Sequence, residues 1–269
     1  MMKLGLIGRN INYSLSGKIH DFALHSFGVK GSFTLFNLEE DELGVFLSNA
    51  WEEGMHGFSV TTPYKKTLAE LLGNRELSAV NTLYRTSEGW ASCSTDGAGF
   101  IRGLQRIDFQ PQDFRRIVIL GAGGVLPALL RCFADFAPEI YVLRRKSSGD
   151  EGLKALNPTL RFFDWQPSEL CTLLKGAGSE TLLIQASSAP LRGDSLVNFA
   201  DAMKGFGGVF VDLVYGTPSH LFYQAQEMKL PCQDGLPMLI EQARLAQELW
   251  FDRSLSFESL WEHLAGVGS

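Results

Sequence analysis

The chain has 269 residues, of which 45% are hydrophobic and 20% are charged, and its formal net charge is −6. This is enough apolar material for a folded core and enough length for two domains. A mildly acidic chain lacks the basic surface by which proteins bind nucleic acid or an anionic membrane, so a bound anion must be held by a local pocket. We therefore expect small-molecule partners, with no nucleic acid and no membrane.

Cysteine usage and apolar run lengths indicate a cytoplasmic protein. The four cysteines are far apart and form no CxxC pair, which argues against a zinc ribbon or a thioredoxin motif and favours free thiols in a reducing compartment. The apolar run at the N-terminus is too short for a signal peptide. The longest one, residues 117–130, contains glycines and a proline and is shorter than the ~20 residues of a membrane span. His20 and His25 lie five apart rather than at the i, i+4 spacing of a metal-binding helix, so no metal is expected.

The first 100 residues alternate between strand and helix patterns. Such alternation predicts a parallel or mixed sheet covered by helices. The predicted strands are 3–8, 31–39 and 56–62, the predicted helices are 17–27, 40–54 and 65–73, and a hairpin is predicted from 79–86 and 89–95.

The pattern restarts near residue 100, which predicts a second α/β domain. A helix is expected at 99–107, a strand, turn and helix at 115–136, and further strands at 139–145, 181–188 and 207–215. The last segment, 237–264, is helix-rich, with a stripe that we expect to be buried at Leu239, Ala243, Leu245 and Leu249. The expected division is one domain of residues 1–100 plus 236–269 and a nucleotide-binding domain of residues 101–235.

A glycine-rich turn follows the buried strand at 117–120. The residues Gly121, Ala122, Gly123 and Gly124 lead directly into a helical pattern. In a dinucleotide site the first glycine allows the tight turn, the next lets the backbone approach the pyrophosphate, and the helix N-terminus presents free N–H groups. Leu126 stands where the strict motif has its third glycine, so a plain strand-to-helix turn remains an alternative. The context predicts a doubly wound, Rossmann-type domain.

The next strand ends in three cations, Arg144, Arg145 and Lys146. An NAD site places an acidic residue near this position to bind the ribose 2′-OH. A 2′-phosphate instead needs charge-assisted hydrogen bonds, which arginine provides in bidentate form. A solvated basic turn would have the same sequence, but together with the glycines the cations favour NADP over NAD.

Six polar residues at loop positions of the first domain could bind a small polyhydroxylated molecule. Each has a structural alternative, since the serines and the aspartate can cap helices and the asparagine can hold a turn. As a group they suit carbonyl reduction by NADPH, in which a lysine ammonium protonates the developing alkoxide and a carboxylate orients the lysine. The six are Ser14, Ser16, Thr61, Lys65, Asn81 and Asp96.

These motifs, in this order, resemble the shikimate dehydrogenase family over essentially the whole chain. The matching segments are YSLSGKIH, GMHGFSVTTPYKK, AVNTL, STDGAG, GAGG, the arginine pair and DGLPMLIEQA. The resemblance implies an NADP-dependent enzyme, a monomer or homodimer, that interconverts 3-dehydroshikimate and shikimate. It implies that Lys65 is the catalytic acid and base and that Asp96 is its partner. The implied substrate contacts are Ser14, Ser16, Thr61, Asn81, Tyr215 and Gln242, and the implied cofactor contacts are Gly121, Ala122, Gly123, Gly124, Arg144, Arg145, Ser187 and Gly235.

Several positions depart from the family pattern and leave two alternatives open. Ser59 and Ser94 stand where the family usually has asparagine, and Gln185 and Ser187 replace the asparagine and threonine of N-A-T-S. One alternative is a related dehydrogenase that acts on quinate or an amino-substituted analogue. The other is a regulatory homologue that binds shikimate and NADP with low turnover.

Overall fold

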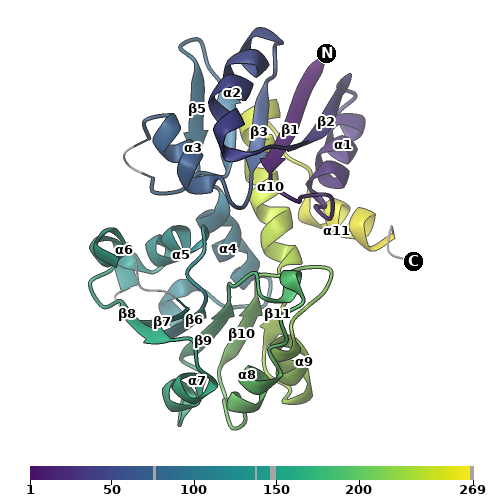
Figure 1. Ribbon diagram of the computed structural model, residues 1–269. Helices are drawn as coiled ribbons and strands as arrows, with labels where there is room; N and C mark the ends of the chain where they lie inside the picture. Colours follow the sequence, from purple (N-terminus) through teal and green to yellow (C-terminus); the bar gives the residue numbers. More distant parts are fainter. Residues whose placement is uncertain (75–76, 137, 146–149, 267–269) are drawn as a thin grey trace. The chain divides into compact units, whose positions relative to one another are not determined.

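The structure is a computed structural model that describes residues 1–74, 77–136, 138–145 and 150–266. The chain forms two compact units (Figure 1). Unit 1 comprises Met1–Gly99 and Ile240–Ser269, and unit 2 comprises Phe100–Leu239. The helices α4 (Asp96–Gln105) and α10 (Leu236–Phe251) have residues in both units. No helix within the described ranges is long and apolar enough to cross a membrane.

Unit 1 contains a mixed five-stranded sheet in the order β2-β1-β3-β4-β5. β1 pairs in parallel with β2 and β3, whereas β4 is antiparallel to both of its neighbours, as expected for the predicted hairpin. The strands are β1 (Met2–Gly8), β2 (Gly31–Asn37), β3 (Gly57–Val60), β4 (Thr82–Arg85) and β5 (Trp90–Cys93). The helices are α1 (Ser16–Ser26), α2 (Leu43–Glu52), α3 (Lys65–Leu71) and α11 (Phe257–Gly266), with a 3-10 turn, η1 (Glu40–Glu42), before α2.

Alternating side chains of β1 bury both faces of this sheet. Leu4 and Leu6 pack with Trp250 of α10 on one face, and Ile7 packs with Leu47 of α2 on the other. The period of two follows from the strand backbone, which points successive side chains to opposite faces. The same geometry fixes where the loops after β1 and β3 leave the sheet.

The buried stripe of α10 differs from the predicted one. Ala243 is buried as expected, but Leu249 is 41% exposed, and Ala246 and Trp250 are buried instead. The spacing of three and four residues is also helical, and the small alanines let the helix lie close to the sheet. The Trp250 indole then donates to the Leu83 carbonyl oxygen at 3.0 Å. The predicted stripe was wrong at Leu249, because the prediction weighed hydrophobicity and not side-chain size.

Unit 2 contains a parallel six-stranded sheet in the order β11-β10-β9-β6-β7-β8. Numbered within the unit this is the 3-2-1-4-5-6 order of doubly wound dinucleotide-binding domains, which confirms the predicted α/β, Rossmann-type fold class. The strands are β6 (Arg116–Leu120), β7 (Glu139–Arg144), β8 (Arg161–Asp164), β9 (Thr181–Gln185), β10 (Val209–Asp212) and β11 (Cys232–Gln233).

Helices cover both faces of the parallel sheet. Along β6, Ile117 and Ile119 pack against one hydrophobic cluster and Val118 and Leu120 against another, so the strand is apolar throughout. The helices are α5 (Leu126–Cys132), α6 (Asp150–Leu156), α7 (Pro167–Leu174), α8 (Val197–Ala202) and α9 (His220–Glu227), with 3-10 turns η2 (Pro111–Asp113), η3 (Ala134–Phe136) and η4 (Pro190–Arg192).

Candidate active site

A buried ion pair joins the first residues of two helices in unit 1. Lys65 begins α3 and Asp96 begins α4, and the distance from Lys65 Nζ to Asp96 Oδ2 is 2.6 Å. Their side chains are only 14% and 6% exposed. Salt and water screen such a pair far less than a surface pair. An ammonium has three N–H donors, and Asp96 accepts from one of them, so the lysine can also donate to a substrate.

Asn81 connects this pair to the helix α10. Its Nδ2 donates to Asp96 Oδ1 at 2.8 Å and to Gln242 Oε1 at 3.1 Å, and its side chain is buried. Gly99 permits the approach of α10, because a Cβ there would lie 2.8 Å from the Gln242 backbone nitrogen. The structure therefore brings four predicted residues, Lys65, Asn81, Asp96 and Gln242, into one hydrogen-bonded group.

The sheet of unit 1 fixes the position of Asn81. The Asn81 carbonyl oxygen accepts from the Val60 amide at 2.7 Å, and the Asn81 amide donates to the Cys93 carbonyl oxygen at 3.1 Å. The preceding amide along the chain, that of Val80, donates to the Lys65 carbonyl oxygen at 2.9 Å. Asn81 is thus held by its backbone between β3 and β5, and its side chain is aimed by the fold rather than by a local turn.

Thr95 belongs to the same group, and the sequence patterns did not predict it. It is buried, its amide donates to Asn81 Oδ1 at 2.8 Å, and its Oγ1 accepts from Asn81 Nδ2 at 2.9 Å. The sequence held one signal, a hydroxyl residue directly before Asp96. That signal is weak because only a contact with a distant asparagine gives this threonine a role.

Ser14, Ser16 and Thr61 lie after neighbouring parallel strands. Ser14 Oγ donates to Ser16 Oγ at 3.1 Å and accepts from the Ser16 amide at 3.2 Å, where α1 begins. Thr61 follows β3, and its amide donates to the Ile7 carbonyl oxygen of β1 at 3.0 Å. Because β1 and β3 are parallel, both loops leave the same edge of the sheet. Among the described residues, no hydrogen bond is recorded between these three side chains and the lysine group.

The glycine-rich turn of unit 2 lies at a topological switch point. The strand order reverses between β6 and β9, and ligands of open α/β sheets bind at such points, outside the carboxyl ends of the strands. Gly121 has φ +111°, and a Cβ there would lie 2.8 Å from the Ser187 amide nitrogen, so only glycine fits. The next three residues, Ala122, Gly123 and Gly124, are exposed and lead into α5.

Gln185 closes the turn that carries Ser187. Its Oε1 accepts from the Ser187 amide and the Ser187 hydroxyl, both at 2.8 Å, and its Nε2 donates to the Ser187 carbonyl oxygen at 3.0 Å. Gln185 is fully buried at the end of β9. Its side chain therefore holds this turn against Gly121.

The predicted cations lie beside the turn, at the end of β7. The Gly121 amide donates to the Leu143 carbonyl oxygen at 2.9 Å, directly before Arg144. The Arg144 guanidinium lies 3.6 Å from the centre of the Phe162 ring, and Arg145 Nη2 lies 3.0 Å from Asp194 Oδ2. Lys146, the third predicted cation, is outside the described residues.

Tyr215 and Gly235 follow the last two strands of unit 2. The loop after β10 is held by Asp212, which is buried and accepts from the Val214 amide at 3.0 Å and the Ser219 amide at 2.8 Å. Burial raises the pKa of the Asp212 carboxyl above its usual value. Gly235 donates its amide to the Val214 carbonyl oxygen at 3.0 Å, and a Cβ there would collide with the backbone of Leu213. The loop that carries Tyr215 is thus anchored within unit 2.

Comparisons with known proteins agree with this geometry. Residues 6–83 match the family model of the shikimate dehydrogenase substrate binding domain. A shikimate dehydrogenase (NADP(+)) of Bacillus licheniformis is 29% identical over 267 residues, which cover 95% of this chain and 94% of the relative. That of Bacillus mycoides is 28% identical over 262 residues, 91% of each chain. The chain is thus similar to shikimate dehydrogenases over nearly its whole length. The predicted resemblance is confirmed.

Solved structures of the family share the fold over the whole chain. A chorismate mutase/shikimate 5-dehydrogenase fusion protein from Clostridium acetobutylicum is 26% identical with a TM-score of 0.81, covering 100% of this chain and 97% of that one. The shikimate 5-dehydrogenase of Thermus thermophilus, solved in complex with NADP(H) and shikimate, is 24% identical with a TM-score of 0.81, covering 99% of each chain. The latter likeness supports the fold alone.

The departures from the family pattern differ in their structural roles. Gln185 and Ser187 hydrogen-bond to each other, so the replacement of both residues of N-A-T-S leaves a closed turn. Ser59 is buried in β3, in register with Leu6 and Thr82. Nothing in the structure explains why a serine stands at position 59.

Cys93 lies near the ion pair of Lys65 and Asp96. Burial and the nearby Asp96 charge raise the pKa of the Cys93 thiol to about 11. The thiol is therefore protonated at neutral pH and is a poor nucleophile. Within the described part of the chain, no group of three or more His, Cys, Asp or Glu residues could hold a metal ion.

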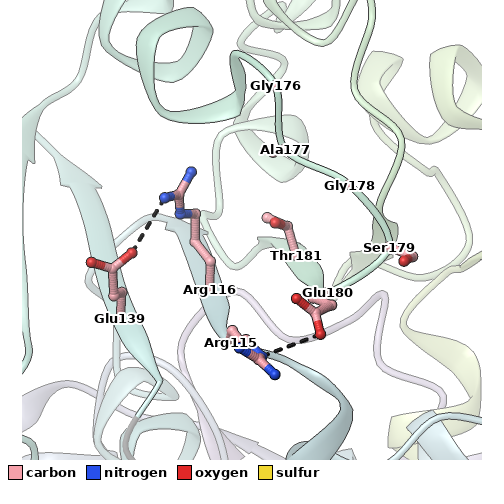
Figure 2. Close-up of a pocket in the computed structure, with 9 residues that line it drawn as sticks. All are labelled: Arg115, Arg116, Glu139, Gly176, Ala177, Gly178, Ser179, Glu180 and Thr181. Atoms are coloured by element: carbon pink, nitrogen blue, oxygen red, sulfur yellow. Dashed lines mark hydrogen bonds and ion pairs between the residues drawn. The ribbon is translucent and has the colours of Figure 1, made fainter.

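A pocket of about 490 Å³ lies where β6, β7 and β9 begin, at the edge of the unit 2 sheet opposite the glycine-rich turn (Figure 2). Both of its arginines are paired, Arg115 with Glu180 at 3.2 Å and Arg116 with Glu139 at 3.3 Å. Because open α/β sheets bind ligands outside the carboxyl ends of their strands, this pocket does not fit a nucleotide site. It is lined by Arg115, Arg116, Glu139, Gly176, Ala177, Gly178, Ser179, Glu180 and Thr181.

Proposed function

We propose that the protein is an NADP-dependent oxidoreductase that interconverts 3-dehydroshikimate and shikimate. The observation that carries the proposal is the buried pair of Lys65 and Asp96, separated by 2.6 Å and held by Asn81. Relatives of nearly equal length bear the name shikimate dehydrogenase (NADP(+)). We assign substrate binding and proton transfer to unit 1 and cofactor binding to unit 2.

The residues of unit 2 fit a dinucleotide phosphate. The turn at Gly121 lies at the switch point and has no room for a side chain, so its backbone can approach a pyrophosphate. Arg144 and Arg145 follow the neighbouring strand and can donate to a 2′-phosphate. Ser187 and Gly235 line the same carboxyl edge of the sheet. The bound cofactor would supply the hydride acceptor and donor.

Lys65 moves the proton in the proposed mechanism. In reduction its ammonium donates a proton to the oxygen of the reacting carbonyl, and in oxidation its amine accepts the proton from the hydroxyl. Asp96 orients the lysine and hydrogen-bonds to the same hydroxyl. Asn81 donates to Asp96 and thereby fixes the carboxylate, whose second oxygen would otherwise be free to rotate away.

The remaining polar residues bind and orient the substrate. The converging hydroxyls of Ser14 and Ser16 can donate to its carboxylate, and Thr61 lies at the end of the neighbouring strand. The Gln242 amide, joined to Asn81, can bind a ring hydroxyl. Tyr215 is assigned the same role from unit 2.

A cytoplasmic location is part of the proposal. Its support is that Cys93, Cys132, Cys171 and Cys232 are free thiols, as is usual in a reducing compartment. Small molecules are the proposed partners, and the proposed state is a monomer or a homodimer. Light scattering during size-exclusion chromatography distinguishes these two states.

A substrate and cofactor panel tests the function. Purified protein is mixed with NADP or NAD and with shikimate, quinate or an amino-substituted analogue, and NADPH or NADH formation is followed by absorbance. The expected result is the highest kcat/KM for shikimate with NADP. A higher kcat/KM for quinate or the analogue would show that this compound, rather than shikimate, is the preferred substrate. Tight binding of shikimate and NADP without turnover would instead identify the regulatory homologue.

A further inference from the structure

Two charged residues that the sequence motifs did not predict lie beside Arg145, at the end of β7. Arg192 ends η4, and Asp194 follows it by two residues. Asp194 Oδ2 lies 3.0 Å from Arg145 Nη2 and 3.4 Å from Arg192 Nη2. One carboxylate oxygen thus bridges two guanidinium groups, and the hydrogen bond with Arg145 helps to hold the pKa of Asp194 below its usual value.

This bridge joins parts of the sheet that are not neighbours. Arg145 follows β7, whereas Arg192 and Asp194 belong to the segment after β9, and β6 lies between these strands. The segment from Ser187 to Asp194 therefore reaches from β9 to the end of β7, on the edge that carries Gly121. It places Arg192 close to Arg145, which follows β7.

Further contacts fix the shape of this segment. Arg192 Nη1 donates to Ser188 Oγ at 2.9 Å, which ties the guanidinium to its own turn. Gly193 has φ +77°, a conformation that suits glycine, and this allows the chain to reverse between the two charged residues. On the other side of the bridge, the Arg145 guanidinium lies 5.3 Å from the centre of the Trp165 ring. The charged groups therefore have partners that hold them in place.

The net charge and the hydrogen-bond donors of this bridge suit a phosphate. In the bridge the two positive charges of Arg145 and Arg192 face the single negative charge of Asp194, so the bridge keeps one net positive charge. A phosphate monoester carries about −1.5 to −2 charges at neutral pH. Each guanidinium has five N–H donors, and Asp194 accepts from one donor of Arg145 and one of Arg192. The carboxylate also offsets the repulsion between the two guanidinium groups.

We propose that Arg192 is a third arginine of the 2′-phosphate site and that Asp194 is a positioning residue that holds Arg145 and Arg192 together before the nucleotide binds. The proposal rests on the proposed function, because it concerns the cofactor that this function requires. It adds a residue from the segment after β9 to a site otherwise built at the end of β7. Discrimination between NADP and NAD then depends on both segments.

Nucleotide titration of the full-length protein tests this proposal without turnover. The probes are 2′,5′-ADP, which has the 2′-phosphate, and 5′-AMP, which lacks it, and binding is measured by calorimetry. Arg192→Gln is expected to weaken 2′,5′-ADP binding about tenfold, since a half-exposed charge-assisted hydrogen bond is lost, and to leave 5′-AMP binding unchanged. Asp194→Asn is expected to weaken 2′,5′-ADP binding about threefold at an unchanged Tm, because only the positioning is lost.

Arg115→Gln is the matched control. Arg115 is also an exposed arginine of unit 2 paired with a carboxylate, but it lies where the strands begin, so binding of both nucleotides should be unchanged. Unchanged 2′,5′-ADP binding in Arg192→Gln would overturn the role of Arg192. Equal or stronger binding in Asp194→Asn would overturn the positioning role. Failure of the proposed function would give a different result. Shikimate-dependent NADP reduction would then be absent, while the wild type still bound 2′,5′-ADP.

Discussion

The buried pair in unit 1 and the arginine–aspartate cluster in unit 2 differ in their exposure to solvent. In unit 1 the side chains of Lys65 and Asp96 are 14% and 6% exposed, whereas in unit 2 those of Arg145 and Asp194 are 51% and 42% exposed. A buried pair has one geometry and is weakly screened, as proton transfer requires. An exposed cluster is screened by salt and water, which suits the reversible binding of an anion. The degree of burial thus distinguishes the group suited to proton transfer from the group suited to anion binding.

Removal of the buried lysine should have the largest effect. In Lys65→Ala we expect kcat to fall about 10³-fold, because general acid–base catalysis typically contributes 10²–10⁴-fold. NADPH affinity should stay within roughly twofold, since the residues proposed to bind the cofactor lie in unit 2. Initial rates and fluorescence titration measure the two quantities.

Lys66→Ala is the control for this substitution. Lys66 is the next residue of α3, is exposed and pairs with Glu70 at 3.6 Å, so its loss should leave kcat unchanged. A Lys65→Ala variant with near-normal kcat would contradict the assigned proton transfer.

Loss of Asn81 should affect both stability and rate. Asn81→Ala removes one hydrogen bond from Asp96 Oδ1 and another from the Thr95 amide, both of them buried, so the free energy of unfolding should fall by about 2–3 kcal/mol. The rate should fall about 30-fold, because Asp96 loses its orientation. Urea denaturation and initial rates test this. A variant of unchanged stability would show that the group is not a tight network.

His20 makes the stability of unit 1 sensitive to acid. It is fully buried, stacks on Phe33 at 4.7 Å, and neither ring nitrogen has a hydrogen-bond partner among the described residues. Burial lowers the pKa of His20 from 6.5 to about 3. Since the unfolded chain binds the proton more tightly, stability is full above about pH 6.5 and falls as the pH drops towards 3.

The expected loss from this histidine is about 2 kcal/mol between pH 7 and pH 5. It is measured as the difference in unfolding free energy between the two pH values. His20→Leu should reduce this difference, because leucine does not titrate, whatever the variant's stability at pH 7. An equal pH dependence in both proteins would show that His20 does not carry the effect.

The smallest expected effect is that of salt, which should act on the exposed cluster more than on the buried pair. Between roughly 0.05 and 0.5 M NaCl we expect the Kd of NADPH to rise about fivefold and kcat to change less than about twofold, because only the exposed charges are screened. NADH, which lacks the 2′-phosphate, is the control and should show a weaker dependence. An equal salt dependence of kcat and Kd would remove the distinction between the two groups.

Features that depend on neighbouring residues could be predicted from the sequence. The turn at Gly121 and its β6 strand form one contiguous signal, and the α/β fold class followed from local periodicity. The group formed by Lys65, Asn81 and Asp96 was predicted from ordered motifs that resemble a known family. In the structure their side chains and Gln242 lie together.

Features that depend on distant contacts could not be predicted in this way. The role of Thr95 follows from Asn81, which lies 14 residues away. The pairing of Asp194 with Arg145 spans 49 residues and crosses β6. The buried face of α10 is decided by the size of Ala246 against β1, which hydrophobicity does not report. In each case the sequence contains the residue but not its neighbour.

The central claim is that Lys65 and Asp96 act as one unit, and a double-mutant cycle on kcat tests it most directly. The cycle compares Lys65→Ala, Asp96→Ala and the double variant, with NADPH affinity measured in each to confirm that unit 2 still binds. A coupled pair is strongly non-additive, so the double variant should lose no more than about as much kcat as Lys65→Ala alone. Losses that multiply would contradict the account.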